Sequence, residues 1–180
     1  MSTTTPIGHK NSFYHPKKGD IVIGVIDKKS NEEWNVDIGF SHQAVLPMLS
    51  FDGATKKNCP KFKRGEVVSA YVEEVPEAGE VILNCIGRTK NEKLGQLTGG
   101  TIIRARPNDL KLIQQNQYID KIGQKTALKC CFGENGRLYI DTENAITTML
   151  VANAIMKALN SEEPVTTFEK ELESIDFAKK

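Results

Sequence analysis

Five short segments with the composition of β-strands follow one another between residues 21 and 86, and they constrain the fold more than any other feature of this chain. Each segment is rich in apolar or β-branched residues, and turns that contain glycine mark the connections. Short strands joined in this way favour a small closed barrel with five strands. The segments span residues 21–26, 34–38, 44–46, 66–75 and 81–86.

The second of these segments indicates which side chains share a face. Trp34, Val36 and Ile38 alternate with Asn35 and Asp37, and successive side chains of a strand point to opposite faces. Trp34 could in principle offer its ring to a nucleobase. Its parity with Val36 and Ile38 favours packing in the barrel core instead, and we predict that position.

The pattern changes at residues 88–95, which form the predicted domain boundary. A strand over residues 101–105 is followed by two short helices, the first with an N-cap from Pro107-Asn108-Asp109, then by two strands and a longer helix over about residues 143–159. Asn135-Gly136 predicts the tight turn between the two strands. The order strand, helix, helix, strand, strand, helix is that of a KH domain.

The predicted fold class is therefore mixed, all-β plus α/β: an oligonucleotide-binding (OB) barrel followed by a KH domain. The predicted domains are the barrel over residues 17–88 and the KH domain over residues 94–160. A flexible N-terminal extension over residues 1–16 precedes them. Residues 161–180 follow as an acidic tail, with six acidic side chains against three basic ones.

Composition and cysteine usage narrow the function classes. The hydrophobic content of 39% and the charged content of 26% are typical of a soluble globular protein, and neither a membrane-spanning run nor a secretory signal is present. This predicts an intracellular protein without a membrane partner. Cys59, Cys85, Cys130 and Cys131 form no C-x-x-C pair, so we predict neither a metal nor a cofactor, and interpret the thiols as buried or idle.

A cationic loop connects the third and fourth predicted strands. No acidic residue interrupts residues 56–64, and a loop of this kind favours phosphate groups. A solvated connection that is basic by chance is the simpler interpretation of an isolated charge run. The cationic side chains are Lys56, Lys57, Lys61, Lys63 and Arg64.

Four motifs decide between these interpretations. They are Gly19-Asp20-x-Val22-Ile23-Gly24, Val36-Asp37-Ile38-Gly39, Leu49-Ser50-Phe51-x-Gly53-Ala54-Thr55-Lys56-x-Asn58 and Gly133-Glu134-Asn135-Gly136. Together they resemble the RNA-binding cap subunits of the RNA exosome, which combine a ribosomal-protein-S-one-like barrel with a KH domain, and within that family the ribosomal-RNA-processing protein forty type. The resemblance covers about residues 17–160.

The resemblance implies a non-catalytic subunit that stabilises the exosome ring and guides single-stranded RNA into its channel for 3′-to-5′ degradation and processing. The implied partners are RNA, ring subunits and neighbouring cap subunits, without a small-molecule substrate. The implied locations are the nucleus, with the nucleolus, and the cytoplasm.

The resemblance also assigns roles to residues. The family's loop implies RNA backbone contacts for Lys56, Lys57 and Asn58. Charge alone extends this expectation to Lys61, Lys63 and Arg64. The glycine-rich motif implies a structural role at a domain interface, with Gly133, Asn135 and Gly136 as its residues.

Two departures from the family pattern predict weak binding. Barrels that bind RNA on their open face use two aromatic residues and a histidine where this chain has Glu32, Asn35 and Pro47. RNA-gripping KH domains clamp the backbone with a Gly-x-x-Gly loop, but residues 114–118 contain no glycine. We therefore expect little base stacking on the open face, and a structural role for the KH domain.

Two alternatives from other classes stay open at this point. A free-standing single-stranded RNA-binding protein of translation or RNA metabolism would be expected to keep aromatic stacking positions. A nuclease would need clustered carboxylates or a positioned acid and base, whereas Asp120 and Asp141 are isolated in the sequence.

Overall fold

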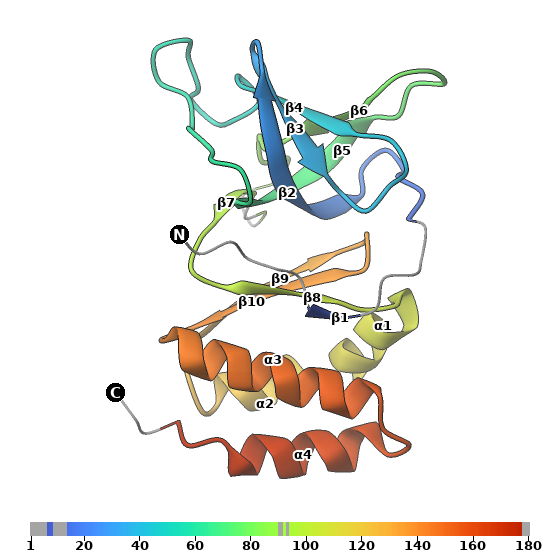
Figure 1. Cartoon of the computed structure of the whole chain (residues 1–180), viewed down its shortest axis with the longest axis vertical. Helices are drawn as coiled ribbons and strands as arrows, with labels where there is room; N and C mark the ends of the chain where they lie inside the picture. Colours follow the sequence, from blue (N-terminus) through green and yellow to red (C-terminus); the bar gives the residue numbers. More distant parts are fainter. Residues whose placement is uncertain (1–6, 9–13, 90–91, 93, 178–180) are drawn as a thin grey trace. The chain divides into compact units, whose positions relative to one another are not determined.

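The computed structural model describes residues 7–8, 14–89, 92 and 94–177. Two compact units divide the chain (Figure 1). Among the described residues, the first unit contains residues 14–89, 92 and 94–98 together with the short segment 132–137, and the second contains residues 7–8, 99–131 and 138–177.

The first unit is built on a closed five-stranded barrel, as the sequence predicted. Its strands follow the order β2-β3-β4-β6-β5, and pairing of β2 with β5 closes the ring. Only β4 and β6 run parallel. A short strand, β7 (Gly95–Leu97), extends the sheet beyond β5. The barrel strands are β2 (Ile21–Ser30), β3 (Glu33–Asp37), β4 (Ala44–Pro47), β5 (Val67–Glu74) and β6 (Val81–Asn84).

Strand β2 closes the barrel because it changes partner along its length. From Ile21 to Val25 it pairs with β5, and from Val25 onward it pairs with β3. Gly24 lies at this change, and a Cβ atom there would come within 2.2 Å of the Val36 side chain. The missing side chain lets the two strands approach closely at the point where β2 switches from one neighbour to the other.

Trp34 lies in the barrel core, as its parity predicted. It is 5% exposed, and its ring meets the ring of Phe62 edge-on at 5.6 Å. The opposite parity did not leave Asn35 open to solvent. Asn35 is also buried, and its side-chain amide donates to Oε1 of Gln43 at 2.6 Å. Residues that follow β3 therefore cover part of the outer surface of this strand.

The second unit combines a small mixed sheet with helices, which confirms α/β elements after the barrel. The sheet has the order β1-β8-β10-β9. Strand β1 (Ile7–Gly8) pairs in parallel with β8 (Thr101–Arg104), and the hairpin consists of β9 (Leu128–Gly133) and β10 (Arg137–Thr142). The helices are α1 (Pro107–Gln115), α2 (Tyr118–Gly123), α3 (Ala145–Leu159) and α4 (Pro164–Ser174).

The start of α1 differs from the predicted one. Arg106 is the N-cap, Pro107 is the first helical residue, and the carboxylate of Asp109 accepts a hydrogen bond from the Arg106 backbone N–H at 2.9 Å. Proline fits the first helical position because its missing N–H would have no partner there. The Pro107-Asn108-Asp109 segment therefore begins the helix, and Asp109 contributes to its cap from the third helical position.

Helix α4 occupies much of the segment that the sequence analysis treated as an acidic tail. Its apolar side chains Phe168 and Leu172 are buried, and the Phe168 ring stacks on Tyr118 of α2 at 3.9 Å with nearly parallel planes. A spacing of four residues places both side chains on one face of the helix. Among the residues that the structure describes, no helix combines the length and apolar composition needed to cross a bilayer.

Replacing Phe168 with alanine tests whether α4 belongs to the folded unit. We expect Phe168→Ala to lower the free energy of unfolding by about 3 to 5 kcal/mol, because it removes a fully buried ring and leaves a cavity. Lys170→Ala, at an exposed site on the same helix, should change it by less than about 0.5 kcal/mol. Urea denaturation followed by circular dichroism gives both values, and equal midpoints for the two variants would contradict this packing.

Candidate nucleic-acid interface

The cationic loop between β4 and β5 is anchored in the barrel by aromatic side chains. Phe51 and Phe62 are buried in the core cluster with their ring centroids 5.8 Å apart. The backbone N–H of Cys85 also donates to the carbonyl of Ser50 at 2.9 Å. Phe51 therefore fixes the loop before the cationic segment, and Phe62 fixes it within that segment, between Lys61 and Lys63.

A compact turn presents the two lysines that the family resemblance singled out. The backbone N–H of Thr55 donates to the carbonyl of Asn58 at 2.9 Å, and the N–H of Asn58 donates back to the carbonyl of Thr55 at 3.0 Å. The Thr55 hydroxyl accepts a further bond from the Asn58 N–H at 3.1 Å. Lys56 and Lys57 occupy the tip of this turn with exposed side chains.

All six loop residues predicted to contact RNA are exposed. Lys56 pairs with Glu32 at 3.4 Å, and Arg64 pairs with Asp27 at 3.1 Å. Solvent-exposed pairs of this kind contribute about 0 to 1 kcal/mol, so a phosphate could displace either carboxylate at little cost. Within the described part of the chain, Lys57, Lys61 and Lys63 form no ion pair.

Glu32, Asn35 and Pro47 stand at the positions where we expect aromatic or histidine rings in a barrel that binds RNA on its open face, and they form a different surface here. A pocket of about 380 Å³ is lined by Glu32, Pro47, Leu49, Lys56 and Cys59, together with Met48, and none of these residues is aromatic. Asn35, the third such position, is buried. This pocket offers a carboxylate and aliphatic carbon, which cannot stack on a base as a ring does.

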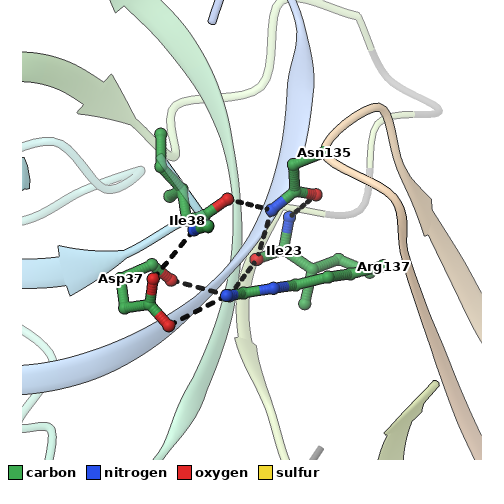
Figure 2. A network of polar contacts seen from close by, with 6 residues as sticks. Ile23, Asp37, Ile38, Asn135 and Arg137 are labelled. Carbon is green, nitrogen blue, oxygen red and sulfur yellow. Dashed lines mark hydrogen bonds and ion pairs between the residues drawn. The ribbon is translucent and has the colours of Figure 1, made fainter. Parts of the chain in front are cut away.

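Side chains at the Asn135-Gly136 turn form a network of hydrogen bonds with the backbone of the barrel. Residues 132–137 cluster with the barrel unit, although residues on either side of them belong to the second unit. Figure 2 shows the side chains of Asn135 and Arg137 directed at the backbone of Ile23 and at Asp37 and Ile38.

Asn135 binds the barrel as a neighbouring strand would. Its side-chain oxygen accepts from the backbone N–H of Ile23 at 3.2 Å, and its amide nitrogen donates to the carbonyl of the same residue at 2.8 Å. The nitrogen also donates to the carbonyl of Ile38 at 2.9 Å. A Cβ atom on Gly133 would come within 2.3 Å of the Asn135 oxygen, and Gly136 has a φ of +73°. Both glycines are therefore required by the geometry of the motif.

Arg137 completes this network, and sequence reasoning missed it. Its guanidinium is 3% exposed and donates to the carbonyls of Ile23 and Asp37 at 3.0 and 2.7 Å. It also pairs with the Asp37 carboxylate at 2.9 Å. A buried cation needs such partners because its desolvation is costly. The arginine directly after Gly136 was the available signal, but its partners lie 100 and 114 positions earlier in the chain.

The described residues contain no group of three His, Cys, Asp or Glu side chains placed to hold a metal ion.

Cys85 is the one buried thiol among the four cysteines, and burial raises its pKa to about 12. Cys130 is exposed, and Cys59 and Cys131 are partly buried. The Asp141 carboxylate lies 3.9 Å from the Lys129 ammonium. Among the described residues, it belongs to no cluster of side chains that could hold a metal ion.

The Asn135 network can be tested with a near-isosteric change. Asn135→Asp replaces the donating amide with a carboxylate that faces the carbonyls of Ile23 and Ile38. We expect the free energy of unfolding to fall by about 2 to 4 kcal/mol, because buried acceptors lose their donor. Hydrogen exchange at the Ile23 amide should also accelerate. Asn153→Asp adds the same charge at an exposed site of α3, and a matching loss of stability in that control would contradict the assigned role.

Comparison with known proteins places these features in a family. Residues 14–95 match the family model described as exosome complex component RRP40, S1 domain. The chain is 32% identical to human exosome complex component RRP40 over 152 residues, which cover 79% of this chain and 53% of the human protein. It is also 32% identical to the Schizosaccharomyces pombe component rrp40, over 83% of this chain and 64% of that protein.

A crystal structure of a candidate exosome complex RNA-binding protein shares the fold. It superposes with a TM-score of 0.72 at 22% identity, over 90% of this chain and 94% of that one. The chain spans between about half and two thirds of the length of the two RRP40 proteins. The barrel therefore matches an S1 domain, and the chain is similar to RRP40 exosome components over about four fifths of its length, as the sequence motifs predicted.

Proposed function

We propose that this protein is a non-catalytic RNA-binding cap subunit of an RNA exosome, which stabilises the ring and guides single-stranded RNA into the channel. The observation that carries the proposal is the exposed cationic loop on an S1 barrel: Lys56, Lys57, Asn58, Lys61, Lys63 and Arg64 all face solvent. Exposed cations on an anchored loop attract a polyanion without reading its sequence.

The expected affinity of a single chain is low. If five cations each neutralise one phosphate of a single strand, affinity should fall roughly a hundredfold between 50 and 200 mM salt, from a slope of about −0.7 per contact. The open face adds no ring at Glu32 or Pro47. A weak site of this kind is useful inside a complex, because neighbouring subunits along the same RNA increase the effective concentration.

We also propose that the second unit is a KH domain with a structural role. The order of β8, α1, α2, β9, β10 and α3 supports this, and the helix connection at residues 114–118 lacks the glycines that grip RNA in other KH domains. We propose that Gly133, Asn135 and Gly136 serve a domain interface. The side chain of Asn135 supports a structural role, because it accepts from the Ile23 N–H and donates to the carbonyls of Ile23 and Ile38.

The proposed partners are the ring subunits of the exosome and neighbouring cap subunits. The relatives are named as exosome complex components, and this supports membership of such a complex for the present chain. The proposed locations are the nucleus, including the nucleolus, and the cytoplasm, where RNA is processed and degraded.

Charge removal at the tip of the turn tests the RNA contact. We expect Lys56→Gln with Lys57→Gln to weaken binding of a fluorescent oligouridine. The slope of log affinity against log salt should become shallower by about 1.4, which is two contacts at about 0.7 each. Fluorescence anisotropy over a salt series measures both quantities.

The matched control removes two lysines elsewhere. Lys111→Gln with Lys170→Gln changes the net charge equally at exposed sites of α1 and α4. Binding and salt slope should stay at wild-type values in this control. If both double variants lose the same affinity, the protein attracts RNA by net charge only, and the loop has no special role.

The absence of catalysis is a separate prediction. We expect the purified chain to leave labelled single-stranded RNA intact in the presence of Mg²⁺ or Mn²⁺, because strand scission by metal needs clustered carboxylates. Gel analysis over several hours is sufficient. Cleavage that co-purifies with the protein through successive columns would contradict the non-catalytic assignment.

A further inference from the structure

Phe40 of the barrel unit contacts two further aromatic rings, those of His15 and His42. The ring centroids of His15 and Phe40 are 6.2 Å apart, and those of Phe40 and His42 are 5.2 Å apart. His15 precedes β2, whereas Phe40 and His42 follow β3. Phe40 is half-buried and packs against the barrel core, and both histidines are exposed. A ring anchored in the core is thus flanked by two rings that solvent can reach.

A cavity of about 710 Å³ adjoins two of these rings, Phe40 and His42. Its lining includes Phe40, His42, Gln43, Arg64, Asp27 and Asp37. The volume is within the range of sites that bind small molecules. Arg64 also belongs to the cationic loop, so this cavity connects Phe40 and His42 to the residues that we propose to bind phosphate.

The two carboxylates of this cavity are both compensated. Asp27 pairs with Arg64 at 3.1 Å and accepts a bond from the Gln43 amide at 3.3 Å. Asp37 pairs with the buried guanidinium of Arg137 at 2.9 Å. An RNA strand that approaches the cavity would therefore meet paired carboxylates beside exposed rings, and electrostatic repulsion would be reduced.

We propose that His15, Phe40 and His42 form a stacking platform for unpaired bases of single-stranded RNA, with Arg64 contacting the adjoining phosphate. The proposal rests on the RNA-binding function proposed above and adds a second kind of contact to it. It moves base stacking from the barrel's open face, where Glu32 and Pro47 stand, to the segment that follows β3. Every nucleobase has a π-face, so such a platform would be tolerant of sequence.

The chemistry of the surface favours RNA over a protein partner. Protein interfaces place aromatic anchors in a desolvated apolar centre from which charged residues are depleted. Here the rings alternate with charged and amide side chains, including Arg64 and Gln43. Proteins that bind single-stranded nucleic acids combine such groups: aromatic rings stack on the bases, and a guanidinium contacts the phosphate.

The test compares intact RNA with an abasic strand. The probes are a fluorescent oligouridine and a ribose-phosphate oligomer of the same length without bases, each titrated with the full chain. We expect the wild-type protein to prefer oligouridine by roughly fivefold or more, the scale of one lost stacking contact. The preference should vanish in Phe40→Leu, which keeps an apolar side chain, and in His15→Ala with His42→Ala, which changes exposed rings only.

Two control variants separate stacking from charge and from folding. Lys56→Gln with Lys57→Gln should weaken binding of both probes equally and keep the preference for bases. Ile146→Ala, at a residue of α3 that is 75% exposed, should leave both affinities unchanged. Equal thermal midpoints of the wild-type and double-histidine proteins exclude misfolding as the cause of a loss.

The outcomes distinguish this inference from the function on which it rests. Equal affinity of the wild-type protein for both probes, with a normal salt slope, would overturn the stacking platform and leave RNA binding intact. No binding of either probe would overturn both. If the ring variants bind RNA normally but no longer associate with exosome subunits, the surface is a protein contact and the platform is wrong.

Discussion

The hydrogen bonds between Asn135 and the backbone of Ile23 satisfy a part of β2 that no neighbouring strand covers on that side. Strand β2 pairs with β5 up to Val25 and with β3 only from Val25 onward. On the side where β3 has ended, the N–H and the carbonyl of Ile23 have no strand neighbour. Asn135 satisfies both groups and the carbonyl of Ile38 as well. Buried backbone groups without partners are costly, so the S1 barrel includes residues far outside its own segment.

The sequence predicted the five barrel strands because each of them is a short run rich in apolar or β-branched residues. It failed where an element is too short or too polar to show a period. Strands β1 and β7 contain two and three residues. Helix α4 offers only Phe168 and Leu172 as a buried pair, so charge dominated the interpretation of residues 161–180. Asn35 occupies a position at which alternation predicts an outward, exposed side chain, yet residues that follow β3 bury it. The pattern within one strand does not indicate which other segments will pack over its outer face.

The candidate site was predictable to the extent that its signal is local. The cations of residues 56–64 lie in one uninterrupted segment, and their exposure follows from their charge. The partners of Arg137 and the approach of His15 to Phe40 join segments that are distant in the sequence. The motif around Asn135-Gly136 indicated a turn and a family, but the strand edge that it completes appears only in the folded barrel.

Two arginines of the barrel unit show how burial decides the role of a charge. Arg137 is 3% exposed, and Arg64 is 83% exposed, yet each pairs with an aspartate that lines the same cavity. Removing a partner from the buried pair would leave an uncompensated charge in a poorly solvated position, which fixes Arg137 in a structural role. The exposed pair contributes little to stability, and the solvent-accessible guanidinium of Arg64 can also contact a phosphate. The same guanidinium chemistry therefore holds backbone segments together where it is buried, at Arg137, and stays available to a ligand where it is exposed, at Arg64.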